Sequence, residues 1–382
     1  METLVYVVLS VSLAGNALLL WALRRRRSPV EVPGPERMVR VEVPGPERIV
    51  RVDVPGPERV VQVPGPERMV KVEVPGPERI VRVEVPGPER VVRAGPAPEF
   101  GAGPFPPAVP GGLALGRDGV HDTVVDGADL GSLHVRGGSL RGGRHRADQR
   151  FRRDAFLTRT LPEFPRPTLL SAVSAGNPLG LWSRTAAELL CESLGTQLDA
   201  FAKPLDTALT EGTEGESSDA VTDLLRTVLR GTASSLERLG HRHQADTRDV
   251  SADVLAVLSP LGETSVRRHL VLGTGAGVAL LLRDGAWHPV LELAPDTAWP
   301  AGRALPAGCE LRHQSVHTRP GDVLVLCTGA TAELIRRPEV AKHLADAWAP
   351  GSPDLLGFLQ QAGFRTAGAD TDRTLVCLWE AV

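Results

Sequence analysis

The chain has 382 residues, enough for one or two domains, and 42% of them are hydrophobic, enough for a core. Its net charge of -3 gives no general attraction to nucleic acid, so we expect no nucleic-acid partner. The cysteines are scattered and never spaced as C-x-x-C, which argues against a zinc site or a disulfide framework and fits a reducing compartment.

The first predicted element is an uncharged apolar segment at residues 4–23. At about 1.5 Å per residue, a helix of this length reaches roughly 30 Å, the thickness of the hydrocarbon core of a bilayer. Arginines follow it at 24–27, whereas a cleaved signal peptide has its positive charge before the apolar segment. We therefore predict one uncleaved transmembrane helix. By the positive-inside rule the chain is a single-pass membrane protein with its C-terminal domain in the cytoplasm.

Residues 24–112 form the second part, with a basic flank, a repeat and a linker rich in Pro and Gly. The repeat is V-P-G-P-E-R, and it begins at positions 32, 43, 54, 63, 74 and 85. Pro-Gly favours a turn, whereas the V-R-V-E-V that follows alternates as a strand does. We favour an extended spacer stiffened by its prolines, and the alternative is a set of short strands that pair across units or between chains.

Residues 113–382 form the third part, and its motifs differ from the repeat. V-R-G-G-S-L-R-G-G-R-H-R leads to F-R-R-D-A-F, which contains Asp154, and S-A-V-S-A-G follows. Apolar residues at helical spacing predict a helix at 221–239. R-P-G-D-V-L-V-L-C-T-G-A contains a buried strand that ends in a turn, and D-T-D-R-T-L-V-C-L-W contains Asp372.

In their order along the chain, these motifs resemble those of the type 2C (PPM-type), metal-dependent serine/threonine protein phosphatases. The resemblance implies an α+β fold, an antiparallel β-sandwich flanked by helices, with the metal site at one end between the sheets. It also implies strands at 250–258, 271–282 and 287–293 and a helix at 332–344. In this family two Mg²⁺ or Mn²⁺ ions bind a bridging water, lower its pKa and present it to a phosphoserine or phosphothreonine.

The acidic positions of the family can be compared with this chain one by one. Asp154 and Asp372 match two of them. The acid of the family's V-x-D-G falls on Ala175, that of its V-G-D on Thr274, and that of its T-D-G on Gly329. Divalent ions about 3.5–4 Å apart repel each other strongly, so bridging carboxylates are indispensable. The resemblance therefore implies a degenerate member, with no cofactor or with weakly bound Mn²⁺ or Mg²⁺ at Asp154 and Asp372.

An arginine cluster lies between residues 141 and 153, and its simplest interpretation is a solvated face. The resemblance gives one of its members a phosphate-facing role, because a guanidinium pairs with two phosphate oxygens at once. The candidates are Arg141 and Arg153.

Three functions remain open from the sequence. The leading hypothesis is a membrane-anchored pseudophosphatase that binds a protein partner or a phosphoprotein. The second is an active phosphatase with a rearranged metal site, which uses Asp154, Asp372 and Glu333. The third makes the V-P-G-P-E-R repeat the functional part, as a structural tether or self-association module.

Overall fold

The structure is a computed structural model that describes residues 61–65, 68–72, 81–82, 97–102, 105, 121–211, 216–293, 304–308, 310–369 and 371–381. The predicted transmembrane segment at 4–23 and most of 24–112 lie outside the described residues. Among the helices that are described, none is long and apolar enough to cross a membrane. The chain divides into two compact units, Met1–Val91 and Val92–Val382.

The first unit contains paired strands of the repeat. Strand β1 (Val61–Gly65) pairs antiparallel with β2 (Arg68–Val72), and β3 (Val81–Arg82) pairs parallel with β1. Valines alternate with polar residues along β1 and β2, the pattern of a strand. At these residues the structure has the paired-strand form of the repeat.

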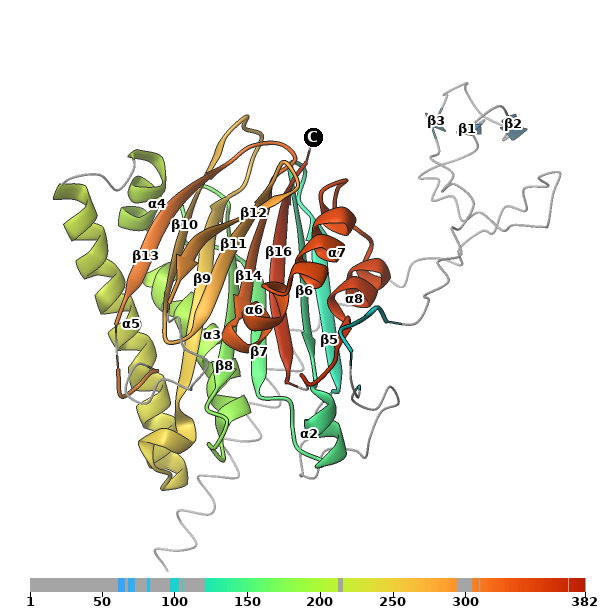
Figure 1. Cartoon of the computed structure of the whole chain (residues 1–382). Helices are drawn as coiled ribbons and strands as arrows, with labels where there is room; N and C mark the ends of the chain where they lie inside the picture. The colour runs from blue at the N-terminus through green and yellow to red at the C-terminus, as the bar shows by residue number, and fades with distance from the viewer. Residues whose placement is uncertain are drawn as a thin grey trace, which may run out of the picture. The chain divides into compact units, whose positions relative to one another are not determined.

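The second unit is a sandwich of two antiparallel sheets, which stand face to face in Figure 1. The five-stranded sheet has the order β13-β10-β9-β8-β7, and the six-stranded sheet has the order β12-β11-β14-β16-β6-β5. A short parallel pair joins β4 (Glu99–Phe100) to β15 (Arg365–Thr366). The sandwich strands are β5 (Thr123–Asp129), β6 (Leu133–Leu140), β7 (Asp154–Leu161), β8 (Thr168–Gly176), β9 (Ala252–Pro260), β10 (Arg267–Thr274), β11 (Gly277–Arg283), β12 (Ala286–Glu292), β13 (Arg312–Thr318), β14 (Val323–Thr328) and β16 (Arg373–Glu380).

The central strands are apolar on both faces because each face is covered. Along β14, Leu324 and Leu326 pack into the core between the sheets, whereas Val325 and Cys327 pack against helices on the outside. A strand covered on both faces reads as a continuous apolar run rather than as an alternation. This explains why V-L-V-L-C is buried at every position.

Helices cover both outer faces of the sandwich, as Figure 1 shows. Helices α3 (Ser183–Ala200), α4 (Ala202–Glu211) and α5 (Glu216–His243) lie on the five-stranded sheet. Helices α6 (Gly329–Ile335), α7 (Pro338–Trp348) and α8 (Leu355–Ala362) lie on the six-stranded sheet. Two short elements, α2 (Gly143–Ala147) and the 3₁₀ helix η1 (Thr247–Val250), sit in connections. The predicted α+β sandwich flanked by helices is confirmed.

Two predicted elements are divided in the structure. The helix predicted at 332–344 is two helices, α6 and α7, because Pro338 lacks a backbone N–H and starts a new helix. The strand predicted at 271–282 is interrupted between β10 and β11, where Gly275 has a φ of +94°. Only glycine adopts this backbone conformation readily, so the chain turns there.

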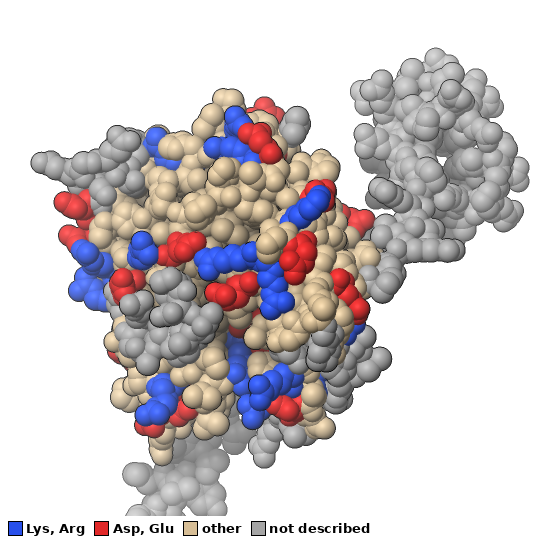
Figure 2. Space-filling view, viewed as in Figure 1, with Lys and Arg blue, Asp and Glu red and all other residues tan. Residues whose placement is uncertain are grey.

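One end of the sandwich gathers strand termini from both sheets. Strands β8, β10 and β14 end there, and β7, β9, β11 and β16 begin there, as their pairing registers require. All the acidic and lost-acid positions singled out in the sequence lie at these termini. On the face drawn in Figure 2, basic and acidic side chains lie next to one another over the described surface.

Candidate functional site

A cross-strand row of three residues crosses this end of the five-stranded sheet. Asp154 of β7 is paired with Ala175 of β8, and Ala175 is paired with Asp253 of β9. Directly opposed residues on adjacent strands share one face of the sheet. Ala175, a lost-acid position, therefore has a carboxylate-bearing residue on either side of it.

Asp154 is buried, and its Oδ2 accepts a hydrogen bond from Thr328 Oγ1 at 3.0 Å. The pKa of Asp154 is raised to about 7, because burial and next the charge of Asp372 raise it more than hydrogen bonds from Thr328 and Thr374 lower it. A buried carboxyl group whose pKa is raised toward neutral pH is typical of a functional site.

Asp372 lies just before β16 and joins it to the segment between β6 and β7. Its Oδ1 accepts a bond from the backbone N–H of Gly142 at 2.7 Å and lies 2.8 Å from His145 Nδ1. Its Oδ2 accepts from the backbone N–H of Arg153 at 2.8 Å. Both carboxylate oxygens are thus engaged by the protein itself.

Asp253 was not among the candidates from the sequence. Its Oδ1 accepts the backbone N–H of Ala175 at 2.8 Å, and its Oδ2 accepts that of Ala276 at 3.1 Å. Burial raises the pKa of Asp253 to about 8, its backbone donors lower the pKa, and the charge of Asp154 raises it. One signal marks it in the sequence: it is a single acid at the start of the apolar run A-D-V-L-A-V-L, and such acids are rarely buried without a reason.

The other two lost-acid positions lie at the same end. Thr274 is buried at the end of β10, where it pairs with Val254 of β9. Gly329 begins α6, and its backbone N–H donates to the carbonyl of Ala276 at 3.1 Å. The structure therefore brings together Asp154, Asp372 and the three positions at which the sequence lacks the family's acids.

The side chains here do not fit a two-metal centre. Within the described part of the chain, no three His, Cys, Asp or Glu side chains are grouped so that they could hold a metal ion. Hard divalent ions need several oxygen ligands and a carboxylate between them. Ala175 and Gly329 offer no side-chain oxygen. Glu333, the substitute suggested by the sequence, is exposed on α6 and lies 3.6 Å from Arg336.

The two phosphate-binding candidates differ in their surroundings. Arg141 is buried, donates from Nη2 to the carbonyl of His145 at 2.8 Å and lies 3.8 Å from the carboxylate of Asp122. Arg153 is half-buried, and its guanidinium has no hydrogen-bond or ion-pair partner among the described residues. Burial lowers the pKa of Arg153. Of the two, Arg153 is the one whose guanidinium is available to an anion.

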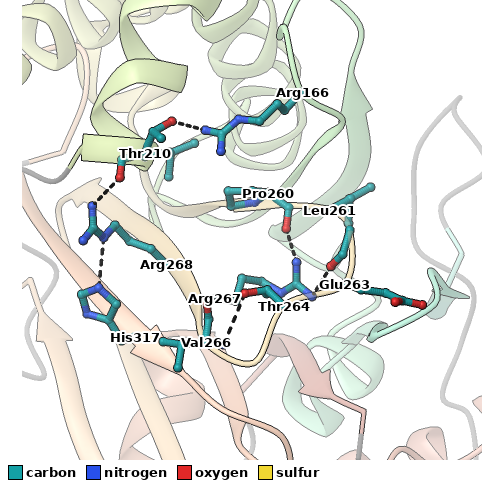
Figure 3. Close-up of a pocket in the computed structure, with 12 residues that line it drawn as sticks. Arg166, Thr210, Pro260, Leu261, Glu263, Thr264, Val266, Arg267, Arg268 and His317 are labelled. Atoms are coloured by element: carbon teal, nitrogen blue, oxygen red, sulfur yellow. Dashed lines mark hydrogen bonds between the residues drawn. The ribbon is translucent and has the colours of Figure 1, made fainter.

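A cavity of about 440 Å³ opens at the other end of the sandwich, beside the connection from β9 to β10 (Figure 3). Its arginines are held by the protein. Arg166 pairs with Asp206 at 2.9 Å, Arg267 pairs with Glu380 at 3.0 Å, and Arg268 donates to the carbonyl of Thr210 at 3.0 Å. The first and the last of these arginines meet the C-terminal turn of α4. The arginines of this cavity therefore stabilise the fold, and the cavity lies at the opposite end of the sandwich from Asp154.

The two-sheet sandwich with helices on both faces is the fold that the sequence resemblance implies, and the comparison of sequences agrees. The sequence profile of the protein phosphatase 2C family matches residues 141–357, more than half of the chain. The chain therefore belongs to the protein phosphatase 2C family. No curated protein matches the chain in sequence.

Solved structures of serine/threonine phosphatases resemble the chain at low identity. The S. agalactiae serine/threonine phosphatase is 14% identical, with a TM-score of 0.44, over 65% of this chain and 99% of that chain. Mycobacterium tuberculosis PstP/Ppp is 17% identical, with a TM-score of 0.42, over 65% and 99%. A PstP catalytic domain in complex with two manganese ions is 16% identical, with a TM-score of 0.40, over 65% and 99%.

Proposed function

We propose that the chain is a membrane-anchored pseudophosphatase, whose protein phosphatase 2C domain binds a phosphorylated protein partner and does not hydrolyse it. One observation carries the proposal. Three positions that hold acids in the family lack them here, and all three lie at the same end of the sandwich as Asp154 and Asp372.

The chemistry of hydrolysis explains the weight of this loss. In the family, two divalent ions activate the attacking water and neutralise the phosphate, and a carboxylate bridges the ions. The bridging position is Ala175 here, and a methyl group cannot bind a metal ion. Asp154 and Asp372 are left with protein donors as partners, from Thr328 and from the backbone of Gly142 and Arg153.

Recognition of phosphate does not require the metal ions. The guanidinium of Arg153 is half-buried and without a protein partner among the described residues, and it carries its charge next to the start of β7. Such a group pairs with phosphate oxygens through parallel N–H bonds. Arg153 is therefore our candidate for the contact with a phosphoserine or phosphothreonine. The predicted anchor at 4–23 and the repeat would keep this contact close to a membrane.

The first experiment asks whether the purified full-length protein hydrolyses p-nitrophenyl phosphate in the presence of Mn²⁺. We expect no hydrolysis above that of the Asp154→Ala variant. Mn²⁺-dependent hydrolysis that Asp154→Ala abolishes would refute the proposal.

The second experiment measures binding of a phosphoserine peptide by calorimetry. We expect Arg153→Ala to weaken binding about tenfold or more, since a charged hydrogen-bonded pair contributes roughly 1.5–3 kcal/mol. Arg150→Ala is the matched control, because Arg150 is an exposed arginine whose ion pair with Asp148 is long, at 3.9 Å, and lies on the surface. Equal affinities for the two variants would remove Arg153 from the proposal.

An active phosphatase with a rearranged metal site is the second candidate, and Asp253 is the observation that favours it. Asp253 places a carboxylate beside the lost acid at Ala175. Calorimetric titration with Mn²⁺ separates the candidates, because tight stoichiometric binding supports the enzyme. The tether hypothesis is tested by deletion of residues 32–93 with the anchor retained, and unchanged assembly would count against it.

A further inference from the structure

Asp253 joins two turns that lie at positions where the family carries acids, Ala175 and Thr274. Its Oδ1 accepts from Ala175, at the end of β8, and its Oδ2 accepts from Ala276, between β10 and β11. We propose that Asp253 is an internal brace: its carboxylate links these two turns at the end of the sandwich where the family binds its metal ions, and so replaces the link that metal-bridging carboxylates would make. The inference rests on the proposed function, since it takes the metal centre to be lost.

The position of Asp253 explains how one carboxylate serves both turns. Asp253 faces Ala175 directly across the β8–β9 pair, so its side chain projects into the space next to the lost bridging acid. The hydroxyl of Ser174 donates to the backbone carbonyl of Asp253 at 2.6 Å and fixes the start of β9 against β8. The carboxylate is therefore aimed by strand pairing and not by a flexible loop.

The turn between β10 and β11 is shaped around Asp253. A Cβ atom added to Gly275 would lie 2.1 Å from the Cβ of Asp253, closer than any real contact. Gly275 also has a φ of +94°, which disfavours other residues. The backbone of this turn thus passes directly over Asp253, and the N–H of Ala276 meets the carboxylate.

The size of residue 175 fits the same interpretation. An acid at 175 would stand between Asp154 and Asp253 in the row, and three adjacent buried carboxylates repel one another unless cations bind them. The methyl group of Ala175 removes this repulsion and leaves its backbone N–H for Asp253. Loss of the acid at 175 and the brace at 253 are therefore compatible parts of one metal-free arrangement.

The brace is tested by amide hydrogen exchange and thermal unfolding of the purified full-length protein. Asn at 253 keeps one acceptor but turns an NH₂ group toward a donor. At pH 9, where the carboxyl group of Asp253 is ionised, we therefore expect Asp253→Asn to speed exchange at Ala175 or Ala276 about tenfold, the factor that corresponds to one hydrogen bond. Asp253→Ala leaves both N–H groups unpaired and should lower the melting temperature by at least about 5 °C.

The control is Asp322→Asn. Asp322 is a buried carboxylate at the opposite end of β14, where it accepts from Arg283 at 3.0 Å. The Asp322→Asn variant should have a lower melting temperature but unchanged exchange rates at Ala175 and Ala276. If Asp253→Ala does not fold, the exchange rates of Asp253→Asn decide.

Two results would overturn the brace. One is unchanged exchange at both amides in Asp253→Asn. The other is stoichiometric Mn²⁺ binding by the unaltered protein that Asp253→Asn abolishes, which would make Asp253 a metal ligand. Failure of the proposed function is read separately, from Mn²⁺-dependent hydrolysis of p-nitrophenyl phosphate. Hydrolysis together with faster exchange in Asp253→Asn would reject the pseudophosphatase and retain Asp253 as a link between the turns.

Discussion

Replacement of Asp154 by Asn should stabilise the protein above neutral pH. Burial, and next the charge of Asp372, raise the pKa of Asp154 from 3.8 to about 7. The folded state therefore binds this proton more tightly than the unfolded chain does. The resulting stabilisation is complete below about pH 4 and is lost as the pH rises to about 7, above which Asp154 is charged in both states.

The magnitude follows from the size of the shift. At 1.36 kcal/mol per pKa unit, a rise from 3.8 to about 7 corresponds to about 4 kcal/mol between the two ends of this pH range. Asn has the shape of Asp and can still accept the hydroxyl of Thr328, but it carries no charge. We expect Asp154→Asn to exceed the unaltered protein in free energy of unfolding by about 2–4 kcal/mol at pH 8, and to match it near pH 4.

The assay is urea unfolding of the full-length protein between pH 4 and pH 9, followed by circular dichroism. The control is Asp223→Asn, an exposed member of an ion pair on α5, whose effect should stay below about 1 kcal/mol at every pH. A residual fall in stability with rising pH should remain in Asp154→Asn, because burial still raises the pKa of Asp253 when the charge of Asp154 is absent. The reasoning is refuted if Asp154→Asn is less stable than the unaltered protein at pH 8, or if the difference is the same at pH 4.

Three further predictions concern the backbone, the core and the lost acids. Gly275→Ala should lower the free energy of unfolding by at least about 2 kcal/mol, because residue 275 has a positive φ and its new Cβ would contact Asp253. The control is Gly285→Ala, which should cost about 1 kcal/mol, because Gly285 has a φ of +75° and open space around it. Chemical denaturation measures both. Leu326→Ala should cost about 2–5 kcal/mol in the same assay, because Leu326 is fully buried between the sheets, and a cost below 1 kcal/mol would contradict this packing. Aspartate restored at each of the three lost-acid positions, combined with Asp253→Ser, should create Mn²⁺ binding that calorimetry detects, and its absence would show that more than these carboxylates has been lost.

The sandwich could be predicted because the ordered motifs of the chain resemble those of the type 2C phosphatases, and its central strands are long apolar runs. V-L-V-L-C-T-G-A could be recognised as a buried strand because both faces of β14 are covered, by the facing sheet and by α6–α8. The breaks were harder to predict. A single glycine at 275 interrupts what reads as one strand, and the start of α7 at Pro338 becomes clear only when the end of α6 is known.

The site was predicted in part, and the part that was missed has a physical reason. Asp154 and Ala175 were found because local motifs surround them. Asp253 was missed because its place beside Ala175 depends on the pairing of β8 with β9, which three α-helices and a 3₁₀ helix separate in the chain. No short motif around Asp253 reports that its carboxylate meets backbone N–H groups from two other turns.

The two acids that match the family differ in how the protein itself uses them. Asp372 binds the backbone at Gly142 and at Arg153, so its loss would release the segment between β6 and β7 from the start of β16 and leave two N–H groups without an acceptor. Asp154 makes fewer such bonds and is the carboxylate whose charge is opposed by burial. At neutral pH and above, a neutral Asn would therefore be the more stable residue at this position. This difference in hydrogen bonding makes Asp154 the acid to test. If its replacement stabilises the fold and abolishes binding of a phosphorylated partner, the carboxylate of Asp154 serves recognition. If binding persists, Asp154 is a remnant of the lost metal centre.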